Sequence, residues 1–103
     1  MLIKPDILAT IHLYNTNEGG RKTPIINGYS CPVYFEKSYK ASGYICKIYL
    51  QNLTNIHPGE VSNNVQVKFL NWDTVKHLIT NNTRLYFREM QFVGELIVEK
   101  IFH

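Results

Sequence analysis

The fold is decided by Ile7-Leu8-Ala9-Thr10-Ile11-His12-Leu13-Tyr14, a stretch in which two kinds of position alternate. Every second residue from Ile7 to Leu13 is aliphatic, and this two-residue period is typical of a β-strand with one face buried. The residues between them would point to the opposite face of the strand. We therefore predict a strand over residues 7–14 that packs one face against a core.

Comparable patterns recur along the chain. They predict five further strands, over residues 28–36, 44–53, 65–69, 84–89 and 92–102. Because proline lacks a backbone donor, we expect the strand that contains Pro32 to be an edge strand or to carry a bulge there. Turn signals separate the strands, and only residues 72–78 suggest a short helical turn, capped by Asn71 or Asp73. The pattern predicts an all-β protein, either a small closed antiparallel barrel or a sandwich.

Length and composition predict one globular domain. The chain has 103 residues, of which 45% are hydrophobic and 18% charged, which suits a sequence that folds unaided. The formal net charge is +3, an excess too small to indicate nucleic-acid binding by itself. Tyrosine, phenylalanine, isoleucine and valine are plentiful, which favours strands over helices.

Several classes of protein are disfavoured by what the sequence lacks. The first six residues contain no apolar run long enough for a signal peptide, and no stretch reaches the roughly 18 apolar residues of a membrane helix. Two cysteines without a secretory signal do not indicate a disulfide scaffold. We therefore expect a cytoplasmic protein with reduced thiols and no membrane partner.

Catalytic and metal-binding patterns are also weak. The histidines and cysteines show no Cys-x-x-Cys or His-x-x-x-His spacing, so we expect no metal and no cofactor; they are His12, His57, His77, His103, Cys31 and Cys46. A Cys–His nucleophilic pair is the enzymatic alternative, but both cysteines fall on apolar strand faces and are better explained as core residues. Glu95 and Glu99 would lie about 13 Å apart on a solvated face, too far for a glycosidase pair. We expect no enzyme activity.

The strongest candidate site is the loop that follows the first strand. Residues 15–24 contain no aliphatic or aromatic side chain and include Glu18, Gly19, Gly20, Arg21 and Lys22. Adjacent glycines let the backbone approach another surface closely, where Arg21 and Lys22 would meet carboxylate or phosphate groups. The alternative is a structural turn in which Arg21 pairs with Glu18 or caps the barrel.

A second polar connection, Lys37-Ser38-Tyr39-Lys40, flanks the same strand. Because loops carry function more often than the sheet that holds them, we predict partner contacts at Glu18 to Lys22 and at Tyr39. A strand of that length spans about 30 Å, so the two segments could lie at opposite ends of the barrel.

Tyrosines form the remaining signal. Four of them fall opposite the predicted core positions and are expected to be exposed, namely Tyr14, Tyr34, Tyr49 and Tyr86. Tyrosines interleaved with lysines stack on bases in RNA-binding proteins and anchor protein interfaces. They also stabilise exposed sheet faces as cross-strand pairs. The sequence leaves these three interpretations open.

Short motifs along the chain resemble, in order and spacing, those of one known family. They are Glu18-Gly19-Gly20-Arg21 with Thr23-Pro24, Gly28-Tyr29 with Tyr34-Phe35, Pro58-Gly59-Glu60, Arg84-Leu85-Tyr86-Phe87-Arg88-Glu89, and Val93-Gly94 followed by an apolar stretch. The family is the third, C-terminal domain of elongation factor Tu, and the resemblance runs from about Ile7 to Ile101. It implies a small six-stranded antiparallel β-barrel and suggests tRNA or other RNA as a partner.

The sequence departs from that family where function is concerned. Tyr29-Ser30-Cys31-Pro32 stands where the family has Tyr-Arg-Pro-Gln, and Arg88-Glu89-Met90-Gln91 stands where it has Arg-Glu-Gly-Gly-Arg. Two arginine positions are lost, which weighs against RNA binding. The P-loop pattern occurs nowhere, so we expect no nucleotide binding and no GTP hydrolysis.

These observations favour a non-enzymatic protein-binding module. Such a barrel could be a translation-factor mimic that engages a partner of that factor, or an immunity or antitoxin protein that neutralises a toxin. The alternative is an accessory protein of translation that binds tRNA or other RNA.

Overall fold

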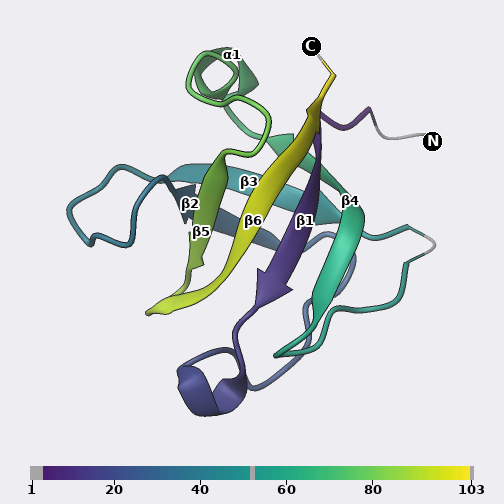
Figure 1. The fold of residues 1–103 in the computed structure, drawn as a ribbon, viewed down its shortest axis with the longest axis vertical. Helices are drawn as coiled ribbons and strands as arrows, with labels where there is room; N and C mark the ends of the chain where they lie inside the picture. The colour runs from purple at the N-terminus through teal and green to yellow at the C-terminus, as the bar shows by residue number, and fades with distance from the viewer. Residues whose placement is uncertain (1–3, 52, 103) are drawn as a thin grey trace.

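The chain forms a closed β-barrel. A computed structural model describes residues 4–51 and 53–102. Its strands are β1 (Ile7–Leu13), β2 (Ser30–Tyr34), β3 (Tyr44–Tyr49), β4 (Val61–Phe69), β5 (Arg84–Arg88) and β6 (Phe92–Ile101). All neighbours are antiparallel, and the order β1-β4-β3-β2-β5-β6 closes because β6 pairs with β1 (Figure 1). The predicted all-β, six-stranded antiparallel barrel is confirmed, and the sandwich is not formed.

The core fills the barrel with the side chains that the alternation placed inside. In β1, Ile7, Ala9, Ile11 and Leu13 are all buried, whereas His12 between them is exposed. Every other strand contributes in the same way, and Phe87 of β5 is the largest side chain that is fully buried. Since apolar burial stabilises by about 25 cal/mol per Å², this interior supplies most of the driving force for folding.

The expectation for Pro32 is wrong. β2 has neighbours on both sides, β3 and β5, so it is not an edge strand of the barrel. Its register with β3 runs through the Pro32–Ile45 pair without a shift, so it carries no bulge there. Pro32 is tolerated because pairing with β5 starts only at Val33. Pro32 has no N–H to donate to the neighbouring end of β5. The carbonyl of Arg88, the last residue of β5, instead accepts a hydrogen bond from the Cys31 thiol at 3.2 Å.

Turns and short helices follow their local sequence. The Glu60 amide donates to the His57 carbonyl at 3.0 Å, and Gly59 has a φ of 87°, as expected for a Pro-Gly turn. The helical turn predicted over residues 72–78 is the shorter α1 (Trp72–Val75). Asn71 is in the cap position, but its side chain makes no capping hydrogen bond. The third strand ends at Tyr49, before the predicted residue 53, and Asn52 lies outside the described residues.

Candidate partner-binding surface

The glycines of the predicted site shape the loop between β1 and β2. A 3-10 turn, η1 (Thr16–Glu18), ends at Gly19, which has a φ of 91° that favours glycine. Gly20 lies against the end of β1, where a Cβ atom would come within 2.2 Å of the Tyr14 carbonyl oxygen. Both glycines are therefore required by the loop itself.

Arg21 is engaged inside the protein and does not pair with Glu18. Its guanidinium donates to the Glu89 carboxylate and to the Thr23 carbonyl, and its charge lies 4.9 Å from the centre of the Tyr29 ring. Only 19% of its side chain is exposed. Glu18 instead accepts a hydrogen bond from the Asn15 side chain at 2.7 Å. Arg21 therefore braces the loop.

The same contacts fix the turn between β5 and β6. The Tyr29 hydroxyl donates to Glu89, and burial raises the pKa of Tyr29, which keeps the phenol protonated as a donor. On the other side of the turn, the Gln91 side-chain amide donates to the Gly19 carbonyl. Residues 89–91 and the loop of Arg21 thus form one braced unit.

Tyr39 reaches the same turn from the connection between β2 and β3. Its ring centre lies 5.5 Å from that of Phe92, at the start of β6. The Arg88 guanidinium contacts the rings of both Tyr34 and Tyr39, at 4.4 and 4.9 Å from their centres. Tyr39 is 66% exposed. The structure therefore brings the two predicted contact segments together at the β5–β6 turn.

The expected exposure of the four tyrosines is wrong, because Tyr34 is buried and Tyr14, Tyr49 and Tyr86 are half-buried. Tyr34 is only 7% exposed, because the Phe92 ring packs edge-on against it at 6.0 Å, the Arg88 guanidinium lies over its ring and the Gly43 backbone lies close to it. Tyr14 and Tyr86 are half-buried under Lys37, whose ammonium lies 4.4 and 5.4 Å from their ring centres. Tyr34 and Tyr86 are register partners, which supports the interpretation as a cross-strand aromatic pair.

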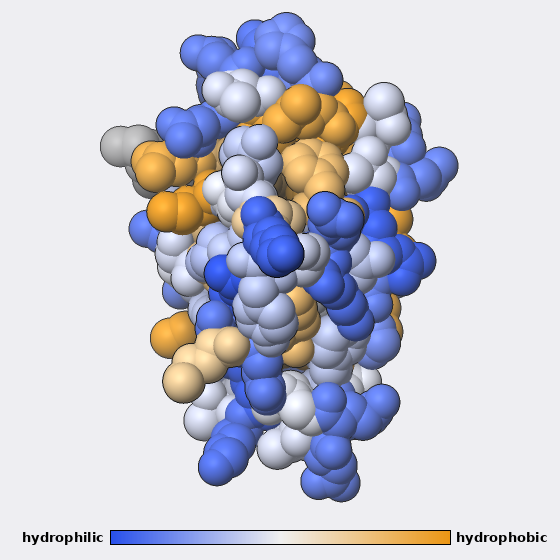
Figure 2. All heavy atoms as spheres, turned by 90° about the vertical axis from the view of Figure 1, so that its left-hand side faces the viewer, coloured by the Kyte–Doolittle hydropathy of each residue, from blue (hydrophilic) through white to orange (hydrophobic). Residues whose placement is uncertain are grey.

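Met90, at the tip of the turn, was not predicted from the sequence as a contact residue. It is 96% exposed, which is unusual for a large apolar residue. Only the structure shows that the turn contacts both predicted segments, through the Arg21–Glu89 pair on one side and the Tyr39–Phe92 rings on the other. We call Lys22, Tyr39 and Met90, all exposed, the tip surface. Figure 2 shows that hydrophilic residues dominate this side of the barrel, with hydrophobic residues gathered mainly toward α1.

The cysteines and the two glutamates that the sequence analysis considered as catalytic groups lie in structural positions. Cys31 and Cys46 are buried and free, lie opposite each other on β2 and β3, and have thiol pKa values that burial raises. Glu95 is not solvated as expected, because its side chain is 12% exposed and pairs with Arg84. Glu99 accepts a hydrogen bond from Thr10. Within residues 4–51 and 53–102, which exclude His103, no three His, Cys, Asp or Glu side chains group together as metal ligands would.

Fold and surface together define a small closed antiparallel β-barrel with a braced, projecting turn. The part of the chain that the structure describes contains no helix of the length and apolar character needed to span a membrane. No family model matches the sequence, and no curated protein matches it either.

Proposed function

We propose that the protein is a non-enzymatic protein-binding module that contacts its partner through the tip surface. The observation that carries this proposal is Met90, a nearly fully exposed apolar side chain on a turn fixed by Glu89 and Gln91. A rigid contact loses little conformational entropy on binding, and exposed apolar and tyrosine side chains supply burial at interfaces. Lys22, the neighbour of Arg21 in the braced loop, adds an exposed cation.

Two biological roles suit such a module. The order of motifs that resembles the third domain of elongation factor Tu, on a six-stranded antiparallel barrel, supports a mimic that engages a partner of that factor. Small size and a contact surface without reactive groups give equal support to the second role, an immunity or antitoxin protein that neutralises a toxin. Both roles place the protein in the cytoplasm, where two free thiols remain reduced.

RNA binding is the alternative, and the tyrosines and lysines of the outer surface are the observation in its favour. Arg88 contacts the rings of Tyr34 and Tyr39, and Lys37 those of Tyr14 and Tyr86, so these rings are less available to bases. The net charge of +3 also neutralises few phosphates. Protein binding therefore remains the first proposal.

A pull-down with the tagged full-length chain from its native lysate, with and without RNase, separates the two. We expect a defined protein partner, identified by mass spectrometry, whose recovery does not change with RNase. Recovery of RNA, or of proteins that disappear with RNase, would favour the alternative.

Variants then locate the contact. Lys22→Glu combined with Met90→Ser changes two exposed side chains and leaves the Arg21–Glu89 pair intact, so the fold should persist. The matched control, Lys100→Glu with Phe102→Ser, also reverses one exposed charge and replaces one exposed apolar side chain by serine, near the other end of the barrel (Figure 1). We expect the first pair to reduce partner recovery at least tenfold and the control to have no effect. Equal recovery by both would exclude the tip surface.

A further inference from the structure

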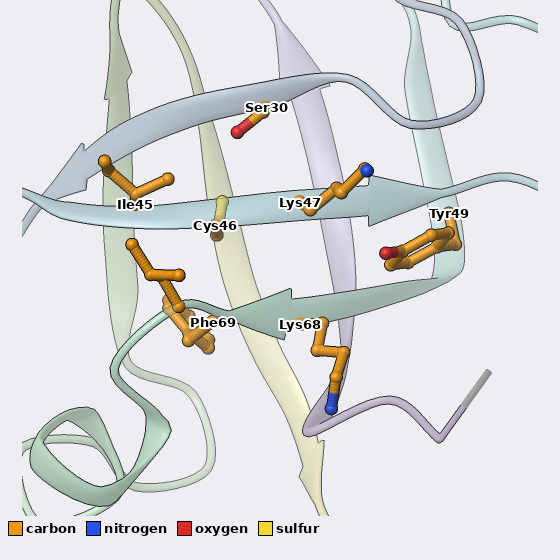
Figure 3. Close-up of a pocket in the computed structure, with 8 residues that line it drawn as sticks. Ser30, Ile45, Cys46, Lys47, Tyr49, Lys68 and Phe69 are labelled. Carbon is orange, nitrogen blue, oxygen red and sulfur yellow. The ribbon is translucent and has the colours of Figure 1, made fainter.

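The outside of β2, β3 and β4 carries a shallow groove of about 320 Å³, and none of the residues that line it belongs to the tip surface. Outward-facing side chains of the three strands and the residue after β4 line it, mainly Ser30, Ile45, Lys47, Tyr49, Lys68 and Leu70 (Figure 3). None of these residues belongs to the sites that the sequence predicted, apart from Tyr49.

Two lysines lie side by side on neighbouring strands of the groove. Lys47 and Lys68 are register partners on neighbouring antiparallel strands, and like charges in that position destabilise a sheet. Figure 3 shows their ammonium groups turned away from each other. Lys68 donates to the Lys4 carbonyl at 3.3 Å and lies 3.8 Å from Asp6. Lys47 has no carboxylate partner among the described residues and lies 5.8 Å from the centre of the Tyr49 ring.

Exposed aliphatic side chains stand beside this basic pair. Ile45 and Leu70 are adjacent across β3 and the end of β4, since the Leu70 amide donates to the Ile45 carbonyl at 3.0 Å, and Leu70 is 72% exposed. Along β3, Ile45 and Lys47 are two residues apart on one face, which corresponds to about 7 Å. The groove therefore presents a basic position and an apolar position at the spacing of alternate residues in an extended chain.

We infer that the groove binds an extended acidic segment of a protein partner. A carboxylate of that segment lies between Lys47 and Lys68 and relieves their repulsion, and an aliphatic side chain two residues away packs on Ile45 and Leu70. A protein segment suits this surface better than RNA, because aliphatic side chains do not stack on bases and the one ring of the groove, Tyr49, already lies under Lys47. The groove is a second contact surface and does not depend on the tip surface.

The probe is the peptide acetyl-Glu-Thr-Leu-Thr-Glu-amide, titrated into the ¹⁵N-labelled full-length protein and followed by amide chemical shifts. We expect shifts concentrated at residues 45–47 and 68–70. Replacing the two Glu of the peptide by Gln, or using Lys47→Gln with Lys68→Gln in the protein, should weaken binding about fivefold or more. Lys100→Gln removes one exposed charge elsewhere and should leave the affinity unchanged.

Three results would overturn the inference. They are an absence of shifts at these residues at millimolar peptide, equal affinity for the Glu and Gln peptides, and tighter binding of oligouridylate than of the peptide at the same residues. The tip variant Lys22→Glu with Met90→Ser should bind the peptide normally, so the outcome is independent of the proposed function.

Discussion

At the scale of single residues, Gly20 shows how little freedom the candidate loop has. Replacing it by alanine puts a methyl group 2.2 Å from the Tyr14 carbonyl oxygen, where only movement of the backbone removes the clash. We expect Gly20→Ala to lower the free energy of unfolding by about 1–3 kcal/mol, measured by urea denaturation. Asn17→Ala, an exposed change in the same loop, is the control and should cost less than about 0.5 kcal/mol. Equal stability of the two variants would contradict this account of the loop.

The buried thiols of Cys31 and Cys46 lead to a second prediction at the scale of single residues. Burial raises the pKa of both Cys31 and Cys46, so both stay protonated in the fold at neutral pH and react slowly. The unfolded thiols ionise near pH 8.5, so stability should be fully retained below that pH and fall as the pH rises above it. Alkylation by iodoacetamide at pH 8 should be slow in the native protein and fast in urea. Rapid native labelling of both would contradict their burial.

At the scale of elements, Arg88 holds the connection over residues 35–43 against the barrel. Because its guanidinium contacts the rings of Tyr34 and Tyr39, removing it should release that connection. We expect Arg88→Ala to increase tryptic cleavage after Lys37 and Lys40 severalfold. Arg84→Ala, on the same strand but paired with Glu95, should not. Similar cleavage of both variants would show that something else holds the connection.

Most strands could be predicted because their alternation is local. β1 follows from the spacing of Ile7, Ala9, Ile11 and Leu13 alone, since a slip by one residue would expose them all. The prediction that the strand of Pro32 is an edge strand or bulged was wrong, because an alternating pattern does not show which neighbouring strand is paired at each position. The predicted exposure of Tyr34 was wrong for a similar reason, since the residues that cover it lie outside its own strand.

The candidate site was predictable only as a set of loops. The glycines around Arg21 indicated a special backbone, and the structure assigns them a local steric cause. The meeting of Arg21, Tyr39 and Met90 at one turn depends on β2 and β6 both lying beside β5. The spacing of residues along the chain does not show which strands are neighbours in the barrel.

At the scale of the whole molecule, non-local pairing dominates. Ile7 pairs with both Val67 and Ile101, residues far away in the sequence. Proteins of this kind fold in milliseconds to seconds, slower than helical proteins of equal size. We expect a refolding time in that range, measured by stopped-flow fluorescence of Trp72, which stacks on Phe69 at 5.8 Å. Microsecond refolding would show that closure of the barrel does not limit the rate.

The β1–β6 seam has a further consequence during protein synthesis. A ribosome adds about 5–20 residues per second, so β1 leaves the exit tunnel several seconds before the strand that completes its pairing exists. Throughout that interval one side of β1 offers unsatisfied amides and carbonyls to any other nascent chain. Crowded polysomes are therefore where this protein is most exposed to misassembly, and chaperones that shelter extended strands would protect it there.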